Sequence, residues 1–372
     1  MQRREFFKQG LVAGAAAACC QKVARGAQRT AKKALMYPGT QSFRSSDEEL
    51  QFLVRHGITN KVAYPTMQGR PWDARIPADG RGYQADDLEK LIEQHDKHGI
   101  RVDMVPLPVA QINVDGGGVP NFMLGKYDKG DREIDLCCDM IRTASKAGIP
   151  AVKYYLCAME NQRTESTPPG RGGSRLSTWD LEKAKNRPQR HAERITADMQ
   201  WERITYFLKR VIPVATEYKV RMACHPCDPW LPPGYRGVDR VLGGAEGFKR
   251  LIEICPSPYH GLNLCLGCMA ESVEDPAKEV PEIVRYFGQR KKIHLIHYRN
   301  IIGGRNKFQE VYLDNGVMDM YVLLKTLKEV GYPYMFVEDH APSHPDDPGG
   351  RQARAFLFGY MIAMLQAVDR ET

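Results

Sequence analysis

The feature that most constrains this chain is a regular alternation of short apolar runs with longer amphipathic segments. Eight runs are rich in β-branched, aromatic and other apolar residues and have the length of buried strands. They cover residues 34–37, 58–64, 101–107, 151–156, 221–224, 261–265, 292–297 and 334–337. Helical patterns lie between several of them, at 86–98, 134–147, 247–254 and 317–330. Eight strands that are each followed by a helix or a long connection predict an α/β fold, a single (β/α)8 barrel.

Two connections are much longer than the others. Residues 108–132 include three consecutive glycines, and residues 161–196 are rich in Gly, Pro and charged side chains. The alternation of strands and helices continues in phase on both sides, so we interpret both connections as loops of one domain and not as linkers. Barrels build their sites on the loops that follow strands. We therefore expect one barrel domain over residues 28–372, with these insertions covering its active-site face.

The first 27 residues differ from the rest of the chain. Arg3 and Arg4 precede Phe6, an uncharged Ala-rich run covers 10–20, and small residues follow up to Ala27. This order is typical of an export signal, here of the twin-arginine type. The sequence predicts export to the periplasm by that route, or a cytoplasmic protein if the signal is not used. A basic N-terminus followed by an Ala-rich helix is the alternative interpretation.

Beyond this signal, neither a membrane nor a nucleic acid is a predicted partner. Residues 10–20 are too few to span a bilayer, and no later stretch approaches about eighteen apolar residues. Cys19 and Cys20 are candidates for a lipid anchor, although Ala16 stands where such signals usually carry Leu. The formal charge of +8 includes a net +4 in residues 1–27, which leaves 48 Lys and Arg against 44 Asp and Glu. This near-neutral body removes the bulk-charge argument for nucleic acid binding.

Eight cysteines lie outside the export signal, far below the density of a disulfide scaffold. Two pairs have the C-x-x-C spacing of zinc sites, Cys224 with Cys227 and Cys265 with Cys268. Each pair stands at the end of a strand-like run. This position favours a role within the barrel pattern over a four-thiolate zinc site.

Four of the strand-like runs end in good metal ligands: His225, Cys265, His297 and Asp339. Each residue alone is easily explained as a buried core group. Their shared position carries more weight, because the C-terminal ends of barrel strands meet at the face where active sites lie. Imidazole, thiolate and carboxylate together fit a divalent ion such as Mn²⁺, Fe²⁺ or Zn²⁺. The sequence therefore predicts one metal site.

An ordered set of segments resembles the mannonate dehydratase family, from about Lys32 to the C-terminus. The segments are His225-Pro226-Cys227-Asp228-Pro229, Gly261-Leu262-Asn263-Leu264-Cys265-Leu266-Gly267, Ile293-His294-Leu295-Ile296-His297-Tyr298-Arg299-Asn300, Asp319-Met320-Tyr321, Asp339-His340, Arg163-Thr164 and Gly170-Arg171-Gly172-Gly173. The resemblance implies a xylose-isomerase-like TIM barrel and a lyase of hexuronate degradation. Such an enzyme uses Mn²⁺ or Fe²⁺, with Zn²⁺ less favoured, to convert D-mannonate to 2-keto-3-deoxy-D-gluconate and water.

The resemblance assigns the metal to His225, Cys265, a histidine of the seventh strand and Asp339. His294 and His297 compete for the third position. They are three residues apart, so a regular strand points them to opposite faces. His297 lies nearer the C-terminal end of the strand, and we therefore predict that His297 is the ligand.

Dehydration of a sugar acid needs a base for the C2 proton and an acid for the C3 hydroxyl. A divalent ion near the carboxylate and the C2 hydroxyl stabilises the charge that develops. His340 resembles the catalytic histidine of the family, and its alternative role is to orient Asp339. Arg299 is a candidate for binding the substrate carboxylate, with a structural ion pair as the alternative. Asn300, Arg163 and Arg171 are further candidates for substrate contact.

Two positions depart from the family pattern. Cys227 stands where members usually have Asp. Residues 347–352 contain no Tyr, whereas members carry a catalytic Tyr in a Pro-Gly-Tyr-Gly segment, and Tyr360 is expected in the last helix. Two alternatives therefore stay open: an exported isomerase, epimerase or β-eliminating lyase acting on another oxidised sugar, and a non-catalytic sugar-binding relative. A homo-oligomer is one of the states that the sequence leaves open.

Overall fold

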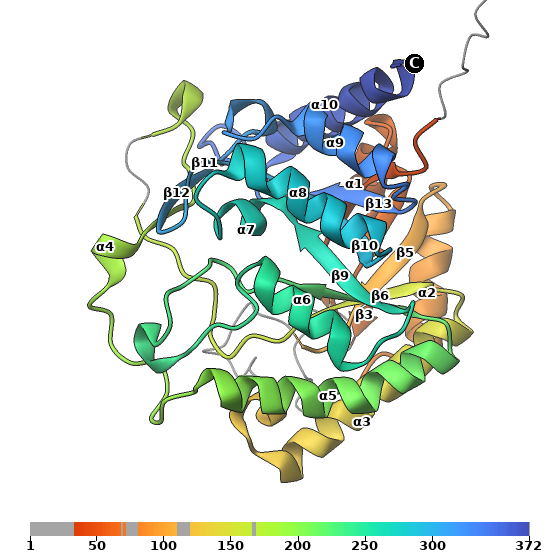
Figure 1. Ribbon diagram of the computed structural model, residues 1–372. Coiled ribbons are helices and arrows are strands. Elements are labelled where there is room, and N and C mark those ends of the chain that lie inside the picture. Colours follow the sequence, from red (N-terminus) through yellow and green to blue (C-terminus); the bar gives the residue numbers. More distant parts are fainter. Residues whose placement is uncertain (1–32, 68–69, 72–80, 110–119, 166–168, 372) are drawn as a thin grey trace, which may run out of the picture.

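The computed structural model describes residues 33–371 except 68–69, 72–80, 110–119 and 166–168. Eight parallel strands close into a barrel, and each strand pairs with the next one along the chain until the last closes onto the first (Figure 1). The barrel strands are β1 (Tyr37–Ser42), β2 (Asn60–Ala63), β5 (Arg101–Pro106), β6 (Ala151–Tyr155), β8 (Arg221–His225), β9 (His260–Cys265), β10 (Ile293–Tyr298) and β13 (Met335–Glu338). This topology confirms the predicted (β/α)8 barrel.

Helices surround the barrel (Figure 1). The longer ones are α1 (Asp47–Arg55), α2 (Ala85–Asp96), α3 (Tyr127–Lys146), α5 (Ala197–Glu217), α6 (Ala245–Ile254), α8 (Pro276–Gln289), α9 (Met320–Glu329) and α10 (Arg351–Arg370). The short ones are α4 (Leu181–Ala184), α7 (Leu266–Ala270) and the 3₁₀ turns Asn121–Leu124, Arg171–Gly173, Tyr235–Gly237 and Leu313–Asn315. Side chains of Ser46, Thr196 and Asp319 cap three of these helices by accepting backbone N–H bonds.

Most barrel strands are buried on both faces, as expected for parallel strands covered by helices, whereas β1 is buried only at its two middle residues. All six residues of β9 and all six of β10 are buried. The first barrel strand was predicted at 34–37 but lies at Tyr37–Ser42. This prediction was wrong because β1 contains polar residues, including Thr40 and Gln41, and has no apolar run to mark it.

Three strands lie outside the barrel and form a small antiparallel sheet. The hairpin of β11 (Asn300–Gly304) and β12 (Lys307–Val311) directly follows β10, and β12 also pairs with β7 (Thr178–Asp180). The predicted insertion 161–196 thus contributes a strand to this sheet. The insertion predicted at 108–132 ends earlier than expected, because α3 begins at Tyr127. Another hairpin joins β3 (Thr66–Met67) and β4 (Arg70–Pro71).

A disulfide joins Cys157 to Cys227, with their Cα atoms 5.8 Å apart. The two residues follow β6 and β8, which are neighbours in the barrel. The bond therefore ties together two loops at the C-terminal face of the barrel. It also excludes Cys227 from a zinc-binding pair with Cys224.

Within the described residues, no helix has both the length and the apolar character that a membrane crossing requires. The predicted export signal, residues 1–27, lies outside the described residues. Its boundary with the barrel domain therefore stays a prediction.

Candidate metal centre and active site

Four side chains meet at the C-terminal face of the barrel: His225, Cys265, His297 and Asp339. One nitrogen, sulfur or oxygen atom from each lies within 4.8 Å of the other three. His297 Nδ1 is 3.1 Å from His225 Nε2 and 3.4 Å from Asp339 Oδ1, and Cys265 Sγ is 3.5 Å from Asp339 Oδ2. Two imidazoles, a thiolate and a carboxylate fit a divalent transition-metal ion. The structure thus brings together the four ligands predicted from the strand ends.

His294 is excluded from this cluster by its position on β10. Its Nδ1 donates to the carbonyl oxygen of Met222 at 3.1 Å, near the start of β8. The cluster lies at the opposite ends of the same strands. The choice of His297 over His294 therefore agrees with the geometry.

Each histidine of the cluster is held through its second nitrogen. Nδ1 of His225 donates to the carbonyl oxygen of Pro226 at 2.7 Å. Nε2 of His297 lies 2.9 Å from Nδ2 of the Asn263 amide, and Oδ1 of that amide has no partner in the described chain. Exchanging the two amide atoms lets Oδ1 accept the Nε2 proton, and Nδ1 of His297 then presents its lone pair to the cluster. Both imidazoles are thereby oriented as ligands.

The environment of Cys265 favours the thiolate. Burial alone would raise its pKa, but hydrogen bonding to Cys268 and the charge of Arg299 hold the pKa well below its usual range. The backbone N–H of Cys268 donates to Cys265 Sγ at 3.4 Å, because Cys265 caps the N-terminus of α7. A thiolate is the form that binds a metal ion.

A cavity of about 210 Å³ opens beside the cluster. Its volume is below the roughly 300–1,000 Å³ of pockets for drug-sized ligands, so it suits a small polar molecule. Its walls come from loops and strand ends at the C-terminal face: Gln41, Ser42, Phe43, Tyr64, Lys153, Tyr155, Asn161, His225, Asp228, Asp339 and His340. A larger cavity of about 490 Å³ lies between α6 and α8, away from the ligand cluster.

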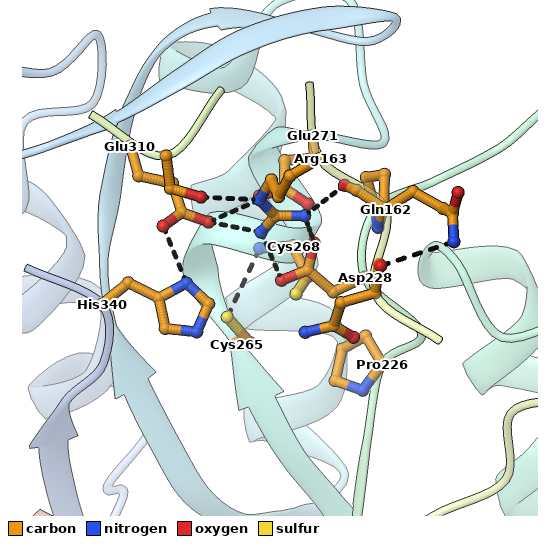
Figure 2. Close-up of polar contacts among 12 residues, drawn as sticks. Gln162, Arg163, Pro226, Asp228, Cys265, Cys268, Glu271, Glu310 and His340 are labelled. Carbon is orange, nitrogen blue, oxygen red and sulfur yellow. Dashed lines mark hydrogen bonds and ion pairs between the residues drawn. The ribbon is translucent and has the colours of Figure 1, made fainter. Parts of the chain in front are cut away.

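His340 borders the 210 Å³ cavity beside the cluster, and its side chain is 40% exposed. Its Nδ1 donates to Glu310 Oε2 at 2.8 Å, which leaves Nε2 as the nitrogen available to a ligand (Figure 2). Burial would lower the pKa of His340, but the carboxylates of Asp339 and Glu310 raise it to about 9. The paired arrangement fits a residue that carries a proton to or from a bound molecule.

A buried network of charges lies behind His340. Arg163 binds Asp228 through two nitrogens, at 2.6 and 2.8 Å, and also contacts Glu310 (Figure 2). Arg299 is fully buried and pairs with Glu271 at 2.5 Å, Glu310 at 3.0 Å and Asp228 at 3.2 Å. It packs so closely on Gly267 that a Cβ there would lie 2.0 Å from its Nε.

This network changes the interpretation of the predicted substrate-binding residues. Arg299 and Arg163 are occupied by carboxylates, which favours the structural ion pair over substrate binding for Arg299. Asn300 is buried, and its amide bonds the backbone of Leu313 and Met318, so it does not reach the cavity. Arg171 pairs with Asp314 and lines a separate cavity of about 400 Å³.

Comparison with known proteins decides the family. Over 344 residues the chain is 32% identical to a mannonate dehydratase of Streptococcus agalactiae, covering 84% of this chain and 94% of the relative. The chain belongs to the mannonate dehydratase family. A profile of D-mannonate dehydratase (UxuA) matches residues 189–372. A mannonate dehydratase of Thermotoga maritima is 27% identical over 331 residues, covering 78% of this chain and 88% of that protein. The family is one of hydro-lyases.

Solved structures share the fold of this mannonate dehydratase family member. A mannonate dehydratase from Streptococcus suis serotype 2 matches with a TM-score of 0.74 and 22% identity, covering 91% of this chain and 94% of that chain. A xylose isomerase domain protein from Planctomyces limnophilus matches with a TM-score of 0.56 and 12% identity, over 90% and 98% of the two chains. The barrel is therefore xylose-isomerase-like, as predicted.

Both departures from the family pattern are visible in the site. Cys227 is held in the disulfide with Cys157. Residues 347–352 lead directly into α10, and Tyr360 is a half-buried residue of that helix, as predicted. The phenols at the cavity are instead Tyr64 and Tyr155.

Lys153, Asp228 and Glu310 are charged residues of the site that sequence reasoning did not select. Lys153 had a detectable signal, because a lysine in the middle of an apolar strand is unusual. Glu310 had none, because the hairpin β11–β12 was not predicted.

Proposed function

We propose that this protein is a metal-dependent dehydratase that converts D-mannonate to 2-keto-3-deoxy-D-gluconate and water. The observation that carries the proposal is the four-ligand cluster and His340 bordering one small cavity. The names of the relatives support mannonate as the substrate. Removal of water from a sugar acid needs these parts: a charge-stabilising centre and a group that carries protons.

The ligand set His225, Cys265, His297 and Asp339 would hold the metal, for which we propose Mn²⁺ or Fe²⁺. A divalent ion there supplies positive charge that stabilises the negative charge developing beside the substrate carboxylate. His340 carries a proton at Nε2, and Glu310 fixes the ring through Nδ1. The ion pairs of Arg163 and Arg299 keep Glu310 in position.

We also propose that the protein works outside the cytoplasm. The paired Arg3 and Arg4 with the apolar run that follows support export. The disulfide between Cys157 and Cys227 supports the same conclusion, because such bonds persist mainly in oxidising compartments. Replacing both arginines with lysine should retain the chain in the cytoplasm, as measured by cell fractionation. Finding the unaltered protein wholly in the cytoplasm with residues 1–27 attached would contradict this proposal.

The activity is tested by incubating the purified protein with D-mannonate and following the 2-keto-3-deoxy acid. We expect turnover with added Mn²⁺ or Fe²⁺ and its loss after chelation. Absence of product with either metal would overturn the substrate assignment. Conversion of another oxidised sugar, or tight sugar binding without turnover, would then favour an isomerase, epimerase or β-eliminating lyase, or a non-catalytic relative. The absence of Tyr from residues 347–352 is the observation that makes these outcomes worth measuring.

A further inference from the structure

Lys153 is a buried cation on the wall of the cavity and has no part in the mechanism above. It lies on β6, two residues before Tyr155, so both side chains are on the same face of the strand. Tyr155 is paired in register with the ligand His225 of β8. This alignment directs Lys153 to the barrel interior, one layer below the ligand cluster. Its exposed fraction is 1%.

The protein supplies little to balance this ammonium. Its Nζ donates to Oε1 of Gln41 at 2.6 Å, and the ring of Tyr155 lies 5.5 Å away. Both partners are neutral. Among the described residues, no carboxylate oxygen lies within the 4.0 Å of an ion pair with Lys153. A buried charge without a counter-charge is costly, so a well-formed site usually provides one or binds one.

The nearest negative charges belong to the ligand cluster. Burial lowers the pKa of Lys153 to about 8, and Asp339 and Cys265 oppose that effect from a distance. When the cluster holds a divalent cation, the ion offsets the charges of Asp339 and Cys265. The protein itself then supplies no counter-charge to Lys153 among the described residues, and an anionic ligand in the cavity can supply one.

The arginines near the site are not available to bind an anionic ligand in the cavity. Arg163 and Arg299 each bind two or more carboxylates. Lys153 differs from both because a neutral side chain is its hydrogen-bond partner. Two of the three ammonium hydrogens stay available for a ligand oxygen.

We infer that Lys153 binds the carboxylate of the substrate and gives the cavity its preference for sugar acids over uncharged sugars. This inference rests on the proposed dehydratase function, to which it adds the group that recognises the substrate charge. Gln41 links the ammonium to the ligand cluster, since its Nε2 donates to Asp339 Oδ1 at 3.3 Å. Lys153 therefore holds the substrate carboxylate on the side of the cavity where the four-residue cluster lies.

The test compares binding of two unreactive ligands to the full-length, Mn²⁺-loaded protein by calorimetry. They are the 3-deoxy analogue of D-mannonate, which has no C3 hydroxyl to lose, and the uncharged amide of that analogue. We expect the unaltered protein to prefer the acid by about 10–100-fold, the range for a hydrogen bond to a charged group. Lys153→Met should lose this preference, Lys153→Arg should keep part of it, and metal content should not change.

Lys61→Met is the matched control, because Lys61 is equally buried on β2, which β5 separates from β6 in the barrel. Its ammonium bonds Arg44 O and Ser45 Oγ and does not line the cavity. This variant should keep the preference for the acid. If Lys153→Met does not fold, as judged by circular dichroism, Lys153→Gln takes its place in the comparison.

Two outcomes would overturn the inference: equal binding of acid and amide by the unaltered protein, or an unchanged preference in Lys153→Met or Lys153→Gln. Turnover of D-mannonate is measured in parallel and judges the proposed function separately. A preference that depends on Lys153 in a protein without turnover supports the inference and contradicts the dehydratase. Turnover of D-mannonate together with a preference that does not depend on Lys153 supports the dehydratase and contradicts the inference.

Discussion

Nδ1 of His340 donates a hydrogen bond to Oε2 of Glu310 at 2.8 Å, and the two residues come from different parts of the fold. His340 follows barrel strand β13, whereas Glu310 lies on β12 of the small antiparallel sheet. The bond fixes the ring and places the hydrogen on Nδ1, so that Nε2 is left for the substrate. This relationship yields predictions for both residues.

Loss of the imidazole should remove the proton carrier. We expect His340→Gln to lower kcat by roughly 10²–10⁴-fold, the usual contribution of general acid–base catalysis. Metal content should stay normal, because the four ligands are untouched. The measurements are turnover and bound metal over a range of Mn²⁺ concentrations. Recovery of the normal rate at saturating Mn²⁺ would instead assign His340 to metal binding, where such orienting residues contribute about 10–100-fold in affinity.

Removal of the Glu310 charge should act through His340. Glu310→Gln is expected to lower kcat by about 10–100-fold, from loss of a charge-assisted hydrogen bond, and Glu310→Asp should retain more of the rate. Glu274→Gln is the matched control, because the Glu274 side chain also pairs with an arginine, Arg305, but is 77% exposed. Steady-state kinetics together with melting temperatures check the prediction. A normal kcat in a well-folded Glu310→Gln protein would show that the pairing has no catalytic importance.

The metal site is tested through its thiolate. Cys265→Ser should lower bound metal and activity together, because a hydroxyl is a poorer ligand than a thiolate. Cys255→Ser, at a half-buried cysteine outside the cluster, should change neither. Elemental analysis of the purified proteins gives the metal content. Full metal occupancy in Cys265→Ser would contradict the assignment of Cys265 as a ligand. Loss of metal in His294→Ala but not in His297→Ala would reverse the choice of histidine.

The disulfide should stabilise the C-terminal face of the barrel. Replacing Cys157 and Cys227 together by serine is expected to cost roughly 2–5 kcal/mol, since the bond closes a separation of 70 residues. Thermal unfolding with and without reductant makes the comparison: reductant should lower the Tm of the unaltered protein towards that of the double variant. An equal number of reactive thiols in the denatured chain with and without reductant would mean that the bond does not form.

Glu160 should make stability depend on acid pH. Burial would raise its pKa, but hydrogen bonds, first that from Arg190, lower the pKa to about 2. Because the folded-state pKa is depressed, the stabilisation is complete above about pH 4.5 and is lost as the pH falls towards 2. Glu160→Gln should be less stable than the unaltered protein at pH 7, by at most about 3 kcal/mol, and the difference should shrink towards pH 2.

Urea unfolding at several pH values measures this difference. Glu182→Gln serves as control, because Glu182 pairs with Lys185 on the surface and such pairs contribute about 0–1 kcal/mol. A gap between Glu160→Gln and the unaltered protein that does not change with pH would contradict the prediction.

Much of the barrel could be predicted from the sequence because its buried strands are apolar runs of the expected length. The ligand positions followed from topology, since His225, Cys265 and Asp339 stand at the ends of runs that a closed barrel must bring together. β1 was misplaced because its polar side chains, such as Gln41, face the cavity, and a site-lining strand has no apolar pattern.

The roles of the arginines could not be predicted in the same way. Whether Arg299 meets a substrate or a carboxylate of the protein depends on Glu271 and Glu310, which are remote from the strand ends. The partner of His340 lies in a hairpin whose strands contain Gly303 and Gly304 and have no apolar alternation strong enough to reveal them.

The hairpin β11–β12 lies outside the barrel, yet it places Glu310 beside His340. The barrel strands that position the four-residue cluster are thus distinct from the hairpin that positions the partner of His340. A change in the length of the turn at Arg305–Asn306 would shift Glu310 while the barrel stayed intact. The pairing of His340 can therefore be altered through this hairpin, with all four residues of the cluster left in place.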